Sequence, residues 1–302
     1  MDNFKRKNKL NFTIVAISSI LVLIISTYSH SADTIQYFDN GKINWSQGRI
    51  YAWGTAKVDN NIKPFRLAQS LAKEKSVILA KKNLIEIIKK VKLDSKVSVE
   101  DLNKSIRYVG AKINNVVKLA EKRTYLVSEE TAKTTLVIQI YGKLSSFLLP
   151  HIKAEAEIEN PDKLLIEKLR RRNLSNQFLS ATATPIKTVK GEYSGLVIDA
   201  RHLHLVPVLF PKIINERGKE IYGISKFSAN DVKKGNIVVY TNDLKSALAN
   251  PRIGPHPLVI RAIEGRKGSN EIVIPNRDSR KIEFENKKNN FLEEGRVAII
   301  LN

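Results

Sequence analysis

The residues with the clearest chemical potential follow one apolar segment, Leu196–Ile198, in the second half of the chain. Asp199 and Arg201 stand where this predicted strand ends, and His202 and His204 come directly after them. Histidines two residues apart share one face of a strand, as paired metal ligands can. No HExxH or equivalent ligand spacing accompanies them, so we predict surface histidines, an Asp199–Arg201 ion pair and no metal site. A metal site remains the alternative, and all four residues are candidate partner-binding residues.

A hairpin follows these residues and supplies a fifth candidate. Its predicted arms, Pro211–Ile214 and Lys219–Tyr222, flank a turn that contains Arg217 and Gly218. Glycine takes the positive φ that such a turn needs, and Arg217 in the same turn is a candidate partner-binding residue. Together with a predicted strand at Val206–Leu209, the hairpin should form one rigid platform, around which the rest of the chain is organised.

No familiar reaction centre is visible in the sequence. It contains no GxSxG motif, no cysteine and no glycine-rich phosphate loop, so nucleophilic catalysis of the known patterns finds no support. We therefore predict a protein that is not an enzyme, with no catalytic residue and no cofactor. The alternative is a hydrolase whose carboxylates come from distant parts of the chain.

The first 32 residues resemble a secretory leader. Basic residues at Lys5–Lys7 and Lys9 precede the apolar run Phe12–Ile25, and small residues at Ser31 and Ala32 permit cleavage. The run is shorter than the ~20 residues of a comfortable membrane span, although an uncleaved anchor is the alternative. We expect an exported protein of the periplasm or outer envelope, which excludes nucleic acid as a partner. Without cysteine it can have neither a disulfide nor a lipid attached through cysteine.

The chain is strongly basic. Its 51 Lys and Arg against 30 Asp and Glu give a net charge of +21, and +18 remains without residues 1–32, which hold four of the bases and one of the acids. Such a balance indicates either an anionic partner or a lysine-rich surface with no special role. The Arg170–Arg172 run is predicted to complete a helix that starts at Pro161, the alternative being a phosphate clamp.

The segment 33–149 is predicted as an α+β domain. The expected elements are a strand pair in Gly41–Val58, a long helix from Pro64, a short helix over Val99–Ile106 and a hairpin of Val116–Val127 with Thr134–Tyr141. In the long helix, an apolar face that includes Leu67, Leu71 and Ile78 should pack on the sheet, and lysines should fill the other face; a membrane-surface helix is the alternative. Trp45 and Trp53 are predicted as core residues, the alternative being a sugar-stacking platform.

This segment resembles a known envelope domain. The strand Tyr51–Ala56, the helix with Ala68, Ala72 and Ala80, and the closing hairpin are similar to the domain of small outer-membrane lipoproteins and of the N-terminal part of flagellar assembly protein T. The resemblance covers about Ile43–Leu149 and includes no acylated cysteine. It implies a non-enzymatic envelope component, with a flagellar role as an analogy.

The remainder is predicted as a helical and linker segment, 150–192, broken at Pro150 and Pro161, followed by a second α+β domain, 193–302. In this domain we expect a mixed sheet whose central strands come from VIDAR, LVIRA and VAIIL. A strand at Asn236–Tyr240, a helix at Asn242–Leu248, a hairpin of Leu258–Ile263 with Glu271–Ile274 and partial helix at Pro275–Glu285 complete the prediction.

Two functions follow from these features. The first is a non-enzymatic scaffold or assembly protein that binds envelope or surface-appendage components, including flagellar ones, through its sheet edges. The second is a basic module for an anionic ligand such as cell-wall glycan or phospholipid headgroups. Salt dependence distinguishes them, because charge-driven binding weakens as ionic strength rises. The oligomeric state is not predicted.

Overall fold

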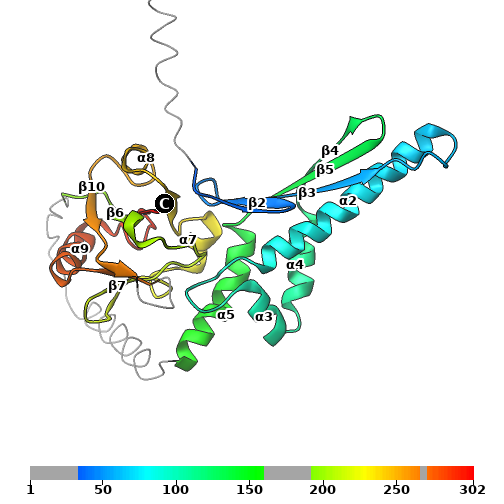
Figure 1. Ribbon diagram of the computed structural model, residues 1–302. Coiled ribbons are helices and arrows are strands. Elements are labelled where there is room, and N and C mark those ends of the chain that lie inside the picture. Colours follow the sequence, from blue (N-terminus) through cyan, green and yellow to red (C-terminus); the bar gives the residue numbers. More distant parts are fainter. Residues whose placement is uncertain (1–32, 160–191, 266–270) are drawn as a thin grey trace, which may run out of the picture. The chain divides into compact units, whose positions relative to one another are not determined.

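The computed structural model describes residues 33–159, 192–265 and 271–302 (Figure 1). The leader, the helix after Pro161, the Arg170–Arg172 run and the proposed linker before Glu192 lie outside the described residues. Helices and sheets occur in both described halves, so the predicted α+β class is confirmed.

The first half is built on a five-stranded antiparallel sheet. Its strands are β1 (Ile35–Phe38), β2 (Gly41–Asn44), β3 (Arg49–Lys57), β4 (Glu121–Ser128) and β5 (Thr131–Gln139). Their order in the sheet is β1-β2-β3-β5-β4. The predicted strand pair and the hairpin are confirmed, and β1 is an additional edge strand. In β3, buried residues alternate with more exposed ones, so one face of the sheet is covered and the other is not.

Helix α2 (Phe65–Lys89) covers the inner face of this sheet through small residues. Ala68, Ala72, Ser76 and Ala80 recur every four residues and are buried, which lets the helix backbone approach β3 closely. A Cβ atom added at Gly54 would lie 2.3 Å from the Ala80 nitrogen and 2.4 Å from the Ser76 oxygen. Small residues on both elements therefore set this packing distance.

The predicted packing face of α2 is partly wrong. Leu67, Leu71 and Ile78 are 47 %, 42 % and 67 % exposed, because the side of the helix that meets the sheet is the alanine and serine seam. At about 100° per residue, the three large side chains lie about 180° from the centre of the buried face. The helix is thus apolar on two opposite sides.

Three further helices complete this half. Helix α3 (Val99–Ser105) has the predicted Ser98 cap, in a reciprocal capping box with Asp101. Helix α4 (Val109–Lys118) replaces the start of the strand expected at Val116, since its buried residues at 109, 113 and 117 follow helical spacing. Helix α5 (Lys143–Glu159) continues through Pro150, which we expected to break it. The buried Leu148, Leu149 and Ile152 pack the helix on both sides of the proline.

The second half contains two four-stranded sheets. The first has the order β10-β6-β13-β9, and all its neighbouring strands are parallel. Its strands are β6 (Gly195–Asp199), β9 (Val239–Thr241), β10 (Pro257–Arg261) and β13 (Val297–Ile300). The side chains of β6 and β13 are buried on both faces of the sheet, which explains their continuous apolar runs. The segments VIDAR, LVIRA and VAIIL do meet here, but LVIRA forms an edge strand, and this sheet is not the mixed one.

The mixed sheet has the order β11-β12-β7-β8. It comprises β7 (Ile213–Asn215), β8 (Glu220–Tyr222), β11 (Glu264–Gly265) and β12 (Ile272–Ile274). The predicted β7–β8 hairpin is confirmed, and Gly218 has a φ of 75°. The predicted hairpin of Leu258–Ile263 with Glu271–Ile274 is confirmed only in part. Strand β11 pairs antiparallel with β12, and the Ile263 N–H donates to the Val273 carbonyl, whereas β10 pairs with β6 in the parallel sheet.

The predicted rigid platform is likewise divided between the sheets, since β6 belongs to the parallel sheet and the hairpin to the mixed one. Val206–Leu209 forms no strand. Instead, the backbone N–H groups of Leu209 and Phe210 donate to the carbonyls of Lys92 and Leu93 in the first half. The short elements η1 (Arg201–Leu203), α7 (Ala229–Lys234) and α8 (Leu244–Ala249) and the longer α9 (Asn276–Asn289) complete the described chain.

Candidate functional site

Asp199 and Arg201 form the ion pair that the sequence predicts. The Arg201 Nε donates to Asp199 Oδ1 at 2.9 Å and its Nη2 to Oδ2 at 2.6 Å, which is a bidentate geometry. These hydrogen bonds hold the pKa of the Asp199 carboxyl below its usual value. The pair closes the end of β6 and leaves Asp199 only 22 % exposed, so its first role is structural.

The two histidines do not share a strand face. His202 lies in the 3₁₀ turn η1, and His204 follows it with a left-handed backbone, φ 48°. Both side chains are exposed, and their directions are set by a turn rather than by the alternation of a strand. Within the described ranges, no group of three or more His, Asp and Glu side chains is arranged to hold a metal ion.

Arg217 lies in a different part of the fold from the other four candidates. It is exposed in the turn between β7 and β8, in the mixed sheet, whereas Asp199, Arg201 and the histidines follow β6 of the parallel sheet. At the carboxyl edge of the parallel sheet, Arg261 of β10 is the register partner of Asp199. Such an edge is the usual place for ligands in parallel sheets. A hollow of only about 10 Å³ is lined there by Leu205, Val206 and Leu301, among others, which follow the carboxyl ends of β6 and β13.

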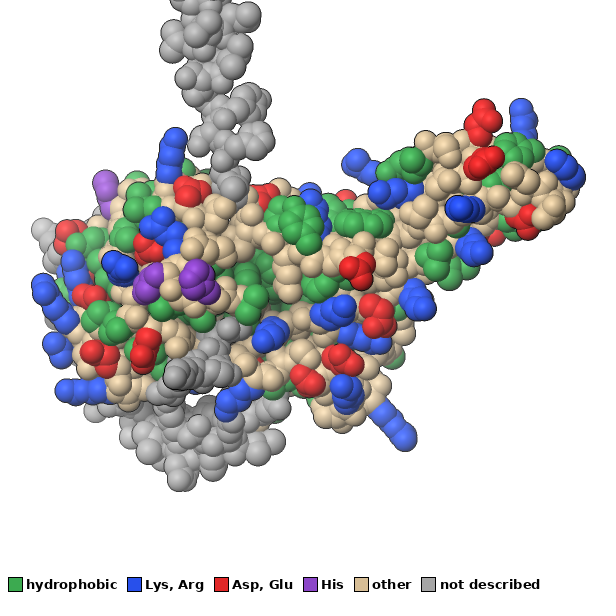
Figure 2. Space-filling view, viewed as in Figure 1, with side chains coloured by type: hydrophobic (Ala, Val, Ile, Leu, Met, Phe, Trp, Pro, Cys, Tyr) green, Lys and Arg blue, Asp and Glu red, His purple; other side chains and the backbone are tan. Residues whose placement is uncertain are grey.

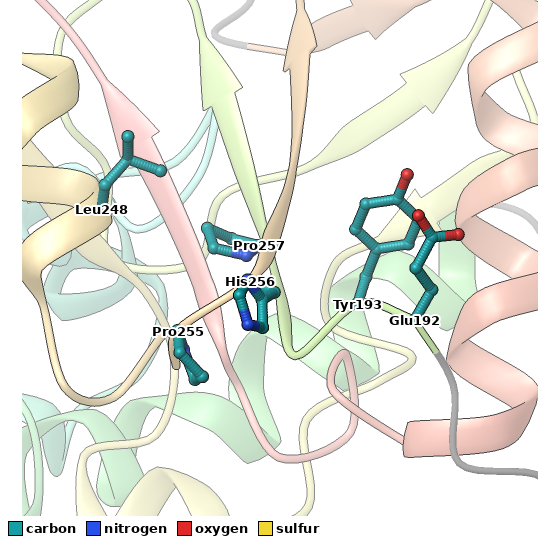
Figure 3. A pocket seen from close by; sticks show the side chains of 6 residues that line it. All are labelled: Glu192, Tyr193, Leu248, Pro255, His256 and Pro257. Atoms are coloured by element: carbon teal, nitrogen blue, oxygen red, sulfur yellow. The ribbon is translucent and has the colours of Figure 1, made fainter.

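A hollow lies at the other end of the parallel sheet. It has a volume of about 540 Å³ and is lined by Glu192, Tyr193, Leu248, Pro255, His256 and Pro257. Figure 3 shows Glu192 and Tyr193 next to one another, and Leu248 well away from them. The Tyr193 hydroxyl accepts a hydrogen bond from Lys281 Nζ at 2.8 Å. The hollow is open to solvent, and its lining contains no nucleophile hydrogen-bonded to a base, so it offers no evident reaction centre.

A more distinctive surface lies on the first-half sheet, on the side away from α2. In Figure 1, α2, α3 and α4 all lie on one side of this sheet. Strand register places four aromatic side chains on the other side, namely Tyr37, Tyr51, Trp53 and Tyr125. Five basic side chains accompany them: Lys42, Arg49, Lys57, Arg123 and Lys133. We call this surface of aromatic and basic residues the open face.

The aromatic and basic residues of the open face are interleaved. Lys42 is the cross-strand neighbour of both Tyr37 and Tyr51, and its Nζ lies 5.4 Å from the centre of the Tyr51 ring. Lys133 is the neighbour of Tyr125, and its Nζ lies 5.5 Å from the centre of the Trp53 ring. These are cation–π distances. In Figure 2, hydrophobic, basic and acidic side chains all appear along the first half.

Sequence reasoning assigned both tryptophans to the core, and this is right for Trp45 alone. Trp45 is 1 % exposed and packs edge-on against Tyr240, with ring centres 5.8 Å apart. Trp53 is half-buried on the open face. The alternation in β3 carried the signal, since Tyr51 and Trp53 interleave with Ile50, Ala52 and Gly54, which are small or aliphatic. The even spacing of eight residues between Trp45 and Trp53 suggests one common face. The β2–β3 turn reverses the chain between the two tryptophans, so their side chains need not share a face.

Leu67, Leu71 and Ile78 form a second exposed surface, on the far side of α2 from the sheet. We call these three residues the outer stripe. The exposed Glu74 lies between Leu71 and Ile78, and Lys75 and Lys82 flank the stripe on the same helix. The open face and the outer stripe therefore lie on opposite sides of one sheet-and-helix layer.

These sheets and helices define an α+β protein with an aromatic and basic sheet face and an aliphatic helix face exposed. The family described as Treponema pallidum Tp0624, second domain, matches residues 195–302. The match begins in β6 and runs to the last residue, so it covers the two sheets of the second half and leaves out the open face and the outer stripe. No curated protein gives a significant match to the chain.

Over the described ranges, no helix combines the length and apolar character needed to cross a membrane.

Proposed function

We propose that the protein is a non-enzymatic scaffold of the cell envelope that assembles with other envelope or surface-appendage proteins. The observation that carries this proposal is the outer stripe. Its three large aliphatic side chains are 42–67 % exposed, on a helix whose opposite side is already packed on a sheet. Neighbouring apolar side chains on an exposed surface mark contact sites, and a helix with two apolar sides ordinarily packs on both.

The spacing of the outer stripe favours a helical partner. Positions 67, 71 and 78 are four and seven residues apart, which is how a helix presents a seam to another helix. The exposed Glu74 stands in the seam between Leu71 and Ile78, and Lys75 and Lys82 flank it. A partner helix with a basic residue opposite Glu74 and acidic residues beside its apolar positions would be complementary. The edge strand β4 begins Glu121-Lys122-Arg123, and charged edges discourage added strands. The proposal therefore rests on α2 and departs from the sheet-edge binding expected from sequence.

The place of action is inferred from the leader. A basic segment, a 14-residue apolar run and small residues at Ser31 and Ala32 are typical of exported proteins. The resemblance of 43–149 to envelope domains supports the same location.

The test is affinity capture of the full-length protein, tagged at its C-terminus, from envelope fractions at low and then high salt. We expect specific envelope proteins to remain bound at high salt, and to be lost with the double variant Leu71→Ser/Ile78→Ser. The control is Leu119→Ser/Val127→Ser, which also removes two exposed aliphatic side chains but lies outside α2. Circular dichroism checks that each variant is folded.

Three outcomes would count against this proposal. If the wild type retains nothing at high salt, the scaffold function is wrong. If the stripe variant retains the same proteins, the outer stripe is not the contact site. If sedimentation shows that the stripe instead holds two copies of this chain together, its partner is the protein itself.

A second function, binding of an anionic envelope ligand, is favoured by the open face. Five of its side chains are basic, and Glu121 is the one acidic side chain that strand register places there on the five described strands. Charge-driven binding of this kind should weaken steeply between low and high salt, unlike retention through the outer stripe.

A further inference from the structure

The aromatic residues of the open face form an oblique line across the sheet. Tyr37 and Tyr51 occupy one cross-strand row, Trp53 the next row along β3, and Tyr125 the row after that. Neighbouring strands are about 4.8 Å apart and alternate residues along a strand about 6.8 Å apart. Tyr37 and Tyr125 are therefore separated by about 24 Å on an ideal flat lattice. This is the extent of an elongated ligand rather than of a small molecule.

The rings are suited to stacking rather than to insertion. Tyr51 and Trp53 are half-buried within the sheet surface, while Tyr37 and Tyr125 are 70 % and 48 % exposed. A flat aromatic surface of this kind can accept the apolar face of a ring, and tyrosine adds a hydroxyl for hydrogen bonds. Tyr51 already directs its hydroxyl to Gln47 Oε1, 3.2 Å away, which fixes the ring in place.

The cations are distributed along this line instead of gathered at one point. Lys42 stands between Tyr37 and Tyr51, Arg123 lies two strands from Trp53 in the same row, and Lys133 is next to Tyr125. Each aromatic ring thus has a cation within one or two strand spacings. A polymer that carries an anionic group on repeated ring units would match this alternation, whereas a single phosphate would use one cation.

We infer that the open face binds a linear acidic glycan, whose sugar rings stack on Tyr37, Tyr51, Trp53 and Tyr125 and whose carboxylate or phosphate groups pair with the intervening Lys and Arg side chains. The inference rests on the second proposed function and gives it a place and a ligand class. A lipid surface fits less well, because binding in the bilayer interface requires protruding apolar side chains. Single-stranded nucleic acid also stacks on such faces, but the predicted leader directs the protein away from it.

The experiment measures binding of the full-length protein to sodium polygalacturonate, a linear carboxylated glycan, at low salt. Neutral dextran, phosphatidylglycerol vesicles and oligo-dT are measured in parallel. The test variant is Lys42→Gln/Lys133→Gln, and its charge-matched control is Lys112→Gln/Lys118→Gln, two exposed lysines of α4 on the other side of the sheet. Lys42→Gln/Lys133→Gln removes two cations that would pair with carboxylates of the polymer, so it should weaken polygalacturonate binding about tenfold. The affinity of the control variant should stay within about twofold of the wild type.

A third variant tests stacking. Tyr37→Ala/Tyr125→Ala leaves the charge unchanged and removes the two most exposed rings, so it should also weaken polygalacturonate binding about tenfold. If this variant binds as the wild type does, the stacking part of the inference is wrong and charge alone holds the polymer. If the control weakens binding as much as Lys42→Gln/Lys133→Gln, the ligand does not use the open face.

The ligand class and the broader function fail in different ways. Binding to vesicles or oligo-dT in preference to polygalacturonate would overturn the acidic-glycan inference and leave an anionic-ligand function standing. Absence of binding to every anionic probe would overturn both. Equal binding to dextran and polygalacturonate would show that the cations have no part in recognition, which also refutes the inference.

Discussion

The close contact between α2 and β3 gives the sharpest prediction about stability. In Gly54→Ala, the new Cβ would lie 2.3 Å from the Ala80 nitrogen, 2.4 Å from the Ser76 oxygen and 2.8 Å from Leu79 Cβ. Ordinary carbon contacts are about 3.5–4.0 Å, so helix and strand must separate by about 1 Å or more. Two of these atoms belong to the backbone of α2, and neither can rotate away.

The expected cost follows from what this separation disturbs. Overpacking a core by a methyl group costs about 1–3 kcal/mol, and here the displaced element is a 25-residue helix. The same contact contains a buried hydroxyl pair, Ser76 Oγ with Thr134 Oγ1 at 2.7 Å. We expect a loss of about 3 kcal/mol, the upper end of that range, which for a chain of this size lowers Tm by about 6–12 °C.

The assay is urea unfolding monitored by circular dichroism, with Gly110→Ala as the matched control. At Gly110, in α4, a new Cβ would approach the flexible Asn103 side chain, at 2.8 Å from its Oδ1. That side chain can move, and alanine favours a helix by about 0.5–1 kcal/mol over glycine, so Gly110→Ala should be neutral or stabilising. If Gly54→Ala is as stable as the wild type, the packing distance between α2 and β3 is not set by small residues.

Three further predictions concern stability and pH. Ser98→Ala removes the α3 capping box and should cost about 1 kcal/mol in thermal or urea unfolding; an unchanged midpoint would mean that the cap contributes nothing. Arg252→Met should cost about 2–4 kcal/mol, because the Arg252 guanidinium donates to the Gly235 and Gly295 carbonyls at 3.1 and 2.6 Å, and a stable variant would show that these carbonyls find other donors. Because the pKa of Asp199 is lowered in the folded protein, its ionised carboxylate should stabilise the fold at pH values above its pKa in the unfolded chain, near 3.9. This stabilisation should be lost as the pH falls through the folded pKa. Asp199→Asn should remove this pH-dependent contribution to the free energy of unfolding, which is about 1 kcal/mol or less and is measured by urea unfolding at several pH values. An identical pH profile in the variant and the wild type would contradict the reasoning.

The sequence by itself determined most of the local structure. The apolar alternation in β3, the long helical period of α2, the Ser98 cap and the turn at Gly218 are properties of short segments, so periodicity and turn chemistry reveal them. Helix α4 was missed because its first residues, Val109 and Gly110, are poor helix formers. Its stability comes from burial of Val109, Ile113 and Val117, which depends on the rest of the fold.

The same difference between local contacts and contacts that depend on the rest of the fold explains why the candidate residues were predicted with mixed success. The Asp199–Arg201 pair is local, two residues apart, and its geometry follows from the end of β6. His202 and His204 were predicted as surface histidines, and both are exposed, in and directly after the 3₁₀ turn η1. Arg217 was identified as a turn residue, but the distribution of strands between two sheets decided that it lies away from the other candidates.

Tertiary structure alone decided where the two binding surfaces are. Whether Leu71 or Ala72 faces the sheet depends on the shape of β3 at Gly54, a contact between segments distant in sequence. Likewise, Tyr37, Trp53 and Tyr125 become one surface through strand register across β1, β3 and β4. A single sequence directly specifies hydrophobic periodicity and turn residues. Strand register, and the side of a helix that faces a sheet, depend instead on how pairs of elements fit together when the chain packs.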